Sequence, residues 1–162
     1  MKTLVIGLGN TILSDDGAGI IISREITERL KKRNIEADVV ELSCGGFRLM
    51  DFLAGYEKII MIDIMHDEKG EAGICRKIDP AIEKPFHLRS SHGLGFFEAL
   101  TLARQTGLLT AEDISIYAVT ARNISDFGEK IDPVIIEKIP DIVENIIAEE
   151  FPACVKTAGI YI

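Results

Sequence analysis

Two adjacent carboxylates stand close to the amino terminus of this 162-residue chain. Asp15 and Asp16 follow a short apolar run and the glycine turn Gly7-x-Gly9, and they precede a segment with helical spacing. A single acid at the start of a helix is enough to cap it and to meet its dipole. Two acids next to glycines, which are poor helix formers, indicate a site that needs negative charge and close approach. Taken alone, the pair is explained equally well by capping.

Asp63 and His92 are two further candidates for such a site. Asp63 interrupts the most strand-like run of the sequence, residues 58–65, near its end. A carboxylate there can be solvated, paired or bound to a metal, whereas in the core it would have to be desolvated. His92 lies before a glycine at a predicted helix start, where the dipole keeps the ring in the neutral form that binds metals. The ordinary alternatives are a carboxylate that caps a loop and a surface histidine, which is what we expect of His66 and His87.

The glycine turn also admits a nucleotide-binding interpretation. A first strand followed by G-x-G is typical of dinucleotide folds, and Glu41 would then be the acid that binds the ribose. Two features oppose this alternative. The position of the third glycine is occupied by Ile12. The paired acids would also repel a pyrophosphate at the helix entrance, where bare amides are needed.

The three cysteines allow one more enzymatic alternative. Cys44, Cys75 and Cys154 are far apart, with no CxxC pair, so neither a disulfide framework nor a thiolate zinc site is indicated. This usage is typical of a reducing, cytoplasmic compartment. Cys44 precedes two glycines and could be a nucleophile with His92 as its base, as in a cysteine hydrolase. Buried, inert thiols are commoner.

The charge and hydropathy of the chain exclude several partners. The net charge is −8 and the isoelectric point is near 4.9, which argues against nucleic acid because phosphates are neutralised by clustered Lys and Arg. A cation, a basic peptide or a neutral protein surface fits better. No apolar run is long enough for a signal peptide or a membrane span. We therefore expect a soluble cytoplasmic protein with no membrane contact.

The elements that position these residues alternate between strand and helix. This alternation predicts the α/β class, as a three-layer sandwich with a mostly parallel, twisted sheet of about five strands and helices on both faces. In such sheets the ligand crevice lies beyond the carboxyl ends of the strands, so the first turn, Cys44 and Asp63 should converge there. The predicted strands are residues 3–6, 37–42, 58–65, 71–78 (an edge strand) and 114–119. The predicted helices are residues 17–33, 47–54 and 92–106 and a stretch that starts at Asp132-Pro133.

The length predicts a single domain over residues 1–162, in which the tail 151–162 has no assigned role. In the last helical stretch Asp132 should cap the helix, and Pro140 should kink or restart it. One apolar face continues across that proline, formed by Ile135, Ile139, Ile142 and Ile146.

Several motifs occur together, in an order that resembles the hydrogenase maturation protease family. The resemblance runs from the first strand to about Glu150, nearly the whole chain. The motifs are Gly7-x-Gly9-Asn10, Asp15-Asp16-Gly17-x-Gly19, Ile59-Ile60-Met61-Ile62-Asp63, Ser91-His92-Gly93 and Phe127-Gly128-x-x-Ile131-Asp132-Pro133.

The resemblance implies an endopeptidase that removes the C-terminal peptide of a [NiFe]-hydrogenase large-subunit precursor after nickel has been inserted. The family's three metal-contacting positions fall on Asp16, Asp63 and His92, which are then also the catalytic residues, with Asp15 as a candidate helper. The metal is nickel supplied by the substrate, although zinc or another divalent ion could occupy three such ligands. The family usually has an aspartate where this chain has Cys44. A catalytic mechanism that needs an acid or base at that position is therefore not expected of this chain.

The expected partner is therefore the hydrogenase precursor. The rival from another class is a non-catalytic, metal-binding chaperone that docks on the same precursor. The sequence leaves the oligomeric state open, with a monomer as the expectation, and it does not identify the hydrogenase.

Overall fold

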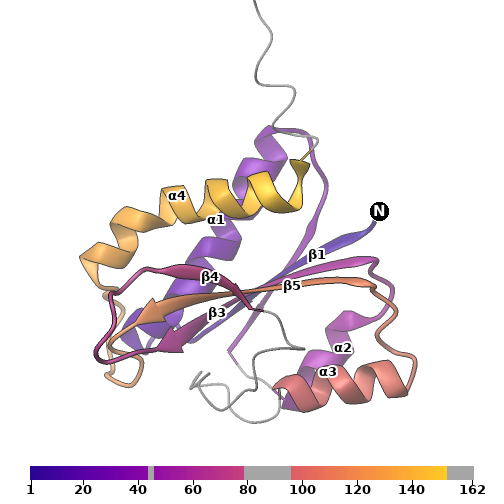
Figure 1. Ribbon diagram of the computed structural model, residues 1–162, viewed down its shortest axis with the longest axis horizontal. Coiled ribbons are helices and arrows are strands. Elements are labelled where there is room, and N and C mark those ends of the chain that lie inside the picture. The colour runs from indigo at the N-terminus through magenta and orange to yellow at the C-terminus, as the bar shows by residue number, and fades with distance from the viewer. Residues whose placement is uncertain (44–45, 79–95, 153–162) are drawn as a thin grey trace, which may run out of the picture.

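A five-stranded sheet forms the middle of the molecule (Figure 1). The computed structural model describes residues 1–43, 46–78 and 96–152. The strand order is β2-β1-β3-β5-β4, and only β4 runs antiparallel to its neighbour. This confirms the α/β class and the mostly parallel sheet. The strands are β1 (Thr3–Leu8), β2 (Asp38–Leu42), β3 (Lys58–His66), β4 (Cys75–Ile78) and β5 (Asp113–Ala121).

The burial of each strand depends on whether it lies in the middle or at the edge of the sheet. All of β1 is buried, and β3 is buried from Lys58 to Ile62, as expected of central parallel strands covered on both faces. The edge strand β2 is mostly exposed. The predicted edge strand 71–78 does lie at the edge, but only Cys75–Ile78 pairs with β5. Gly73, with φ of +76°, turns the chain just before it.

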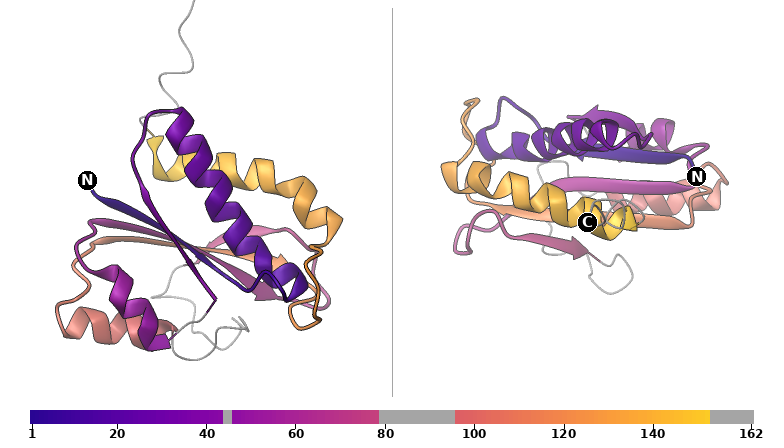
Figure 2. Two further views of the ribbon diagram at one scale, coloured as in Figure 1. Left: turned by 180° about the vertical axis from the view of Figure 1, so that it is seen from behind. Right: turned by 90° about the horizontal axis from the view of Figure 1, so that it is seen from above.

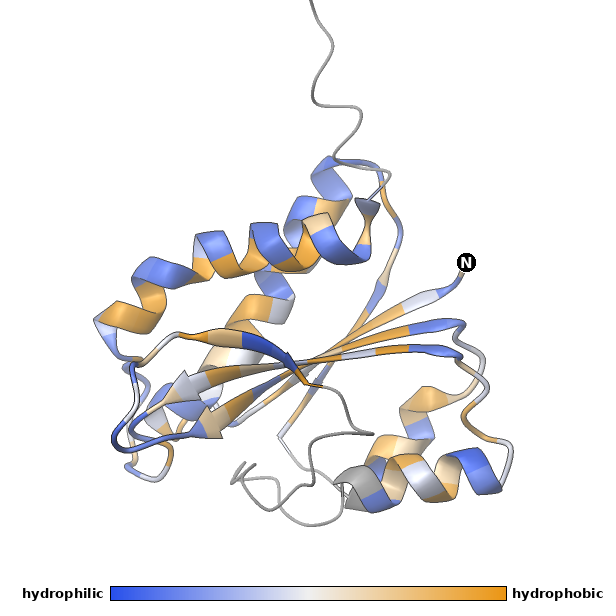
Figure 3. Ribbon diagram, in the orientation of Figure 1, coloured by the Kyte–Doolittle hydropathy of each residue, from blue (hydrophilic) through white to orange (hydrophobic). Residues whose placement is uncertain are grey.

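Helices cover both faces of this sheet (Figure 2). The helices α1 (Ala18–Lys32) and α4 (Pro133–Glu150) lie on one face, and α2 (Met50–Leu53) and α3 (Phe96–Gln105) on the other. Two 3₁₀ turns, η1 (Ser14–Gly17) and η2 (Gly46–Leu49), precede α1 and α2. Two hydrophobic clusters result, one on each face, and Figure 3 shows the apolar stripe of α4 turned toward the sheet.

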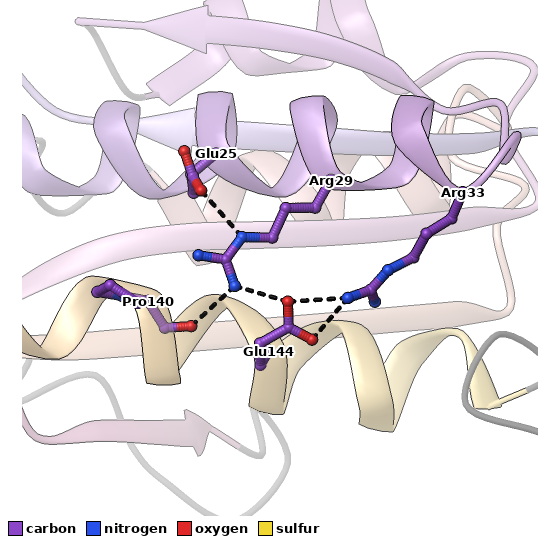
Figure 4. A network of polar contacts seen from close by, with 5 residues as sticks. All are labelled: Glu25, Arg29, Arg33, Pro140 and Glu144. Atoms are coloured by element: carbon purple, nitrogen blue, oxygen red, sulfur yellow. Dashed lines mark hydrogen bonds and ion pairs between the residues drawn. The ribbon is translucent and has the colours of Figure 1, made fainter. Parts of the chain in front are cut away.

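A polar network joins α1 to α4 over their shared face (Figure 4). Arg29 donates to Glu144 at 2.6 Å and to the carbonyl of Pro140 at 3.1 Å, and Arg33 donates to both oxygens of Glu144. Pro140 does not restart the helix, because α4 is continuous through it. The expected cap is confirmed, since Asp132 accepts from the amide of Val134 at 2.9 Å.

The chain changes direction within the sheet at β1. The first crossover, through α1, leads from β1 to β2, and the next one returns to β3 on the other side of β1. A crevice at the carboxyl ends of β1 and β3 is the expected ligand position in such a sheet. Within the described residues, no helix is long and apolar enough to cross a membrane.

Candidate active site

The glycines after β1 allow α1 to approach the sheet closely. Gly9 has φ of +151°, and a side chain there would collide with the carbonyl of Asp16. A side chain at Gly19 would collide with the carbonyl of Leu8 and would lie 3.1 Å from that of Ile62. These two positions therefore require glycine, because the backbones of the turn, β1 and β3 approach one another too closely for a side chain.

Asp16 is enclosed by the turn that it belongs to. Its residue is 0% exposed, and its carboxylate Oδ2 accepts from the amide of Asn10 at 2.8 Å. A buried carboxylate is tolerated only when hydrogen bonds or charges compensate for lost water. The bond to Asn10 fixes the orientation of the carboxylate at the carboxyl end of β1, where the sequence predicts it.

Asp15 ties this turn to the other half of the chain. It is 3% exposed, and its two carboxylate oxygens accept from the amide of Asn123 at 3.1 Å and from the amide of Asp132 at 2.7 Å. Its own amide donates to the carbonyl of Asn123 at 3.0 Å. Both partners belong to the segment between β5 and α4, so Asp15 is a cross-link between two loops more than 100 residues apart.

That segment, residues 122–132, runs beside residues 9–17, the turn that carries Asp15 and Asp16, and supports it. We call residues 9–17 the aspartate turn and residues 122–132 the brace loop. Ser14 donates its amide to the carbonyl of Gly128 at 2.7 Å, and Gly128 donates to the carbonyl of Ile12 at 3.0 Å. The hydroxyl of Ser14 donates to the carbonyl of Asp126 at 3.0 Å. These bonds hold Ser14 at φ of +48°, a conformation that is uncommon for residues other than glycine. In Figure 2 (left) the brace loop, in orange, lies beside the start of α1.

The support from the brace loop is the part of the site that residue-by-residue reasoning missed. The sequence signal for it is the motif from Phe127 to Pro133, which predicts a helix cap but no contact with the aspartate turn. Its physical role is visible in the backbone bonds of Gly128 and in the amide that Asp132 donates to Asp15.

Asp63 lies on β3, level with the end of β1. Gly7 pairs with Ile62, so the next position along β3 faces Leu8. Side chains alternate along a strand, and Met61 belongs to the cluster under α2 and α3, so Asp63 points to that face. Asp63 is partly exposed and accepts from the amide of Ile64 at 2.8 Å. β3 ends at His66, three residues after Asp63, so Asp63 lies near the carboxyl end of its strand, as predicted.

His92, Cys44 and His87 lie outside the described residues. The metal-contacting trio and the cysteine alternative therefore stay predictions. Over residues 1–43, 46–78 and 96–152, no group of three or more His, Cys, Asp or Glu side chains could hold a metal ion. The described helix α3 begins at Phe96, on the face of the sheet to which Asp63 points.

The remaining candidates have other roles. Glu41, the acid of the nucleotide alternative, is held by Arg24 through two bonds of 2.6 Å. His66 is only partly exposed, against our expectation, and its Nε2 lies 3.1 Å from the carbonyl of Arg122. Burial raises the pKa of the Cys75 thiol to about 11, so it is not a thiolate at neutral pH.

Comparison with known proteins assigns the chain to a family. A sequence model of the hydrogenase maturation proteases matches residues 20–149. The chain belongs to the hydrogenase maturation protease family. The matched stretch contains Asp63 and His92 and begins just after the aspartate turn. Members of this family are endopeptidases, that is, hydrolases that act in hydrogenase maturation.

Individual members agree with this assignment. The hydrogenase 2 maturation protease of Escherichia coli is 32% identical over 112 residues, which span 66% of this chain and 66% of that protein. A [NiFe] hydrogenase maturation protease from Thermococcus kodakarensis has a similar structure, with a TM-score of 0.70 and 27% identity over 93% of this chain and 98% of that one. A hydrogenase maturating endopeptidase of Escherichia coli, at 21% identity, shares the fold with a TM-score of 0.72 and covers 98% of this chain and 94% of that one.

Proposed function

We propose that this member of the family removes the C-terminal peptide of a nickel-loaded [NiFe]-hydrogenase large-subunit precursor, in the cytoplasm. The observation that carries the proposal is the aspartate turn. Asp16 is buried, oriented by Asn10, and lies at the carboxyl ends of the two strands where the chain changes direction. Family membership supplies the reaction class, and the relatives named above are described as maturation proteases of hydrogenases.

In this proposal the nickel belongs to the substrate. Asp16, Asp63 and His92 complete the coordination of the nickel that the precursor already holds, because two carboxylates and an imidazole suit a borderline divalent ion. The ion acts as a Lewis acid that polarises the scissile carbonyl or activates a water molecule. Zinc or another divalent ion fits the same ligands. Asp15 contributes by positioning, because both of its oxygens already accept backbone amides.

Cleavage of a precursor tests the proposal directly. Wild-type protein incubated with nickel-loaded large-subunit precursors should shorten one of them, as measured by intact mass, and should leave the nickel-free precursor unchanged. Asp16→Asn, Asp63→Asn and His92→Ala should each abolish processing. Asp141→Asn, an exposed aspartate on α4, is the matched control and should process normally. Full activity in any of the three site variants, with circular dichroism unchanged, would contradict the assignment.

The same experiment separates the rival chaperone function. A chaperone would form a stable complex with the nickel-loaded precursor and leave its mass unchanged. A Cys44→Ser variant that processes at the wild-type rate would eliminate the cysteine-hydrolase alternative.

A further inference from the structure

Two large apolar side chains stand in solvent beside the aspartate turn. Phe127, on the brace loop, is 86% exposed, and Ile12, in the aspartate turn, is 50% exposed. Leu13 and Gly128 form a parallel bridge, so the residues before them, Ile12 and Phe127, are neighbours in the same register. Single exposed apolar residues are common on protein surfaces, but here two of them are adjacent and border the site. We call this pair the apolar rim.

The backbone under the rim is fixed rather than loose. Gly128 donates to the carbonyl of Ile12 at 3.0 Å and accepts from Ser14 at 2.7 Å. On the other side of Phe127, the amide of Asp126 donates to the side chain of Asn123 at 3.2 Å, and the Asn123 amide group donates to Asp126 Oδ2 at 3.1 Å. Because the backbone on both sides of Phe127 is already fixed, a partner that covers the ring has to order only the side chain and not the loop, which favours binding.

The charges around the rim identify what covers it. Asp126 and Glu129 flank Phe127 and are exposed, and they outnumber the exposed Lys130 that follows them. A second copy of this chain would place these acids against their own equivalents, and the net charge of −8 adds to that repulsion. A partner with an apolar residue between basic residues would match both the ring and the carboxylates. The substrate of the neighbouring site must reach the same edge of the sheet.

We propose that the apolar rim is a docking site for the hydrogenase precursor, and that it binds an apolar segment with basic neighbours close to the cleavage point. This inference rests on the proposed function, because it takes the precursor as the substrate. It assigns Phe127 and Ile12 to substrate recognition, separately from Asp16, Asp63 and His92, which act on the metal.

The test compares two exposed apolar residues, Phe127 after the carboxyl end of β5 and Leu108 before its amino end. Phe127→Ala should raise KM for the nickel-loaded precursor about tenfold or more while kcat stays within about twofold, as for a residue that contributes to binding only. Leu108→Ala, which precedes the amino end of β5, is the matched control and should leave KM unchanged. Ile12→Ser should raise KM as well. In the double variant the loss of binding free energy should be smaller than the sum of the two single losses, because the two side chains form one contact.

The outcomes distinguish this proposal from the proposed function. Wild-type cleavage with an unchanged KM in Phe127→Ala and Ile12→Ser would overturn the docking site and leave the protease standing. A fall in kcat alone would also overturn it, because it would show that the ring acts through the aspartate turn. If the wild type cleaves nothing, binding of immobilised precursor decides: weaker binding of Phe127→Ala supports the rim, and equal binding or no binding at all overturns it. A wild-type dimer that Phe127→Ala dissociates in sedimentation would assign the rim to a second copy instead.

Discussion

Asp15 is a buried carboxylate that joins the aspartate turn to the brace loop. Its charge is buried, which would cost several kcal/mol without compensation. Two backbone amides from the brace loop compensate for it, and hydrogen bonds to an ionised group are roughly twice as strong as neutral ones. Asp16 is the next residue in the chain, so the fixed backbone at Asp15 also limits the movement of Asp16. Of the two adjacent acids, Asp15 is thus fixed by a distant segment and Asp16 by the amide of Asn10 in its own turn.

Asp15→Asn should destabilise the protein although it conserves the shape of the side chain. The amide group of asparagine cannot accept from both Asn123 and Asp132, so one buried donor loses its partner, at a cost of about 1–3 kcal/mol. The melting temperature should fall by several degrees in a calorimetric scan, whereas Asp141→Asn, on the exposed side of α4, should leave it unchanged. An unchanged melting temperature in Asp15→Asn would show that the brace loop does not depend on this carboxylate.

The carboxyl end of α4 is held against the sheet by a buried cluster of charged side chains, away from the aspartate turn. Glu150, 5% exposed, accepts from Lys58 on β3, Lys77 on β4 and Tyr117 on β5, at 2.7, 2.7 and 2.6 Å. Burial by itself would raise the pKa of Glu150, but the bonds from Lys58, Lys77 and Tyr117 outweigh it and lower that pKa to about 2. The helix that follows the brace loop is therefore held at its far end by three strands.

The stability of the fold should depend on this cluster in acid. A carboxyl whose pKa is lower in the folded state than in the unfolded state stabilises the fold above its unfolded pKa, and the contribution is lost as pH falls. For Glu150 the loss should occur between about pH 4.5 and pH 2, and it is on the order of 3 kcal/mol. Denaturant titrations across this range should show that decline in the wild type.

Glu150→Gln should remove most of that decline and should also lower the stability at neutral pH by about 3 kcal/mol, because it leaves Lys58 buried with one fewer partner. Glu149→Gln is the matched control: Glu149 also pairs with Lys77, at 2.8 Å, but it is exposed, so its loss should cost less than about 1 kcal/mol. Equal effects of the two substitutions would show that burial does not set the strength of the cluster.

The sequence predicted the elements better than it predicted their connections. The continuous apolar runs of β1 and β3 and the Asp132 cap indicated central strands and a helix start, because burial and capping are read within a few residues. The bonds that join Asp15 to Asn123, or Glu150 to Lys58, depend on distant segments and leave no local pattern. For the same reason the local chain predicts a kink or a restart at Pro140, whereas a restart is absent from the structure: α4 is continuous through Pro140, and the Pro140 carbonyl accepts from Arg29 of α1.

The net negative charge of the protein should guide a basic partner to the proposed site. With a net charge of −8, association with the precursor should be faster at low ionic strength and should slow as salt rises toward about 0.5 M. Glu129→Lys, beside the apolar rim, and Glu112→Lys, at the amino end of β5, change the net charge by the same amount. In stopped-flow measurements the first should slow association several-fold more than the second. Equal slowing by both would mean that only the total charge acts.

The bridge between Leu13 and Gly128 means that the aspartate turn can reach its final structure only after residue 128 has been synthesised. The turn that carries Asp15 and Asp16 is synthesised before the segment that holds Ser14 and Asp15, which follows it by more than 100 residues. Contacts between such distant segments form late, because a long loop must close before they stabilise anything. During synthesis the nascent chain thus carries both aspartates before their backbone partners exist. We therefore expect the proposed cleavage activity only after the brace loop has folded back onto the aspartate turn.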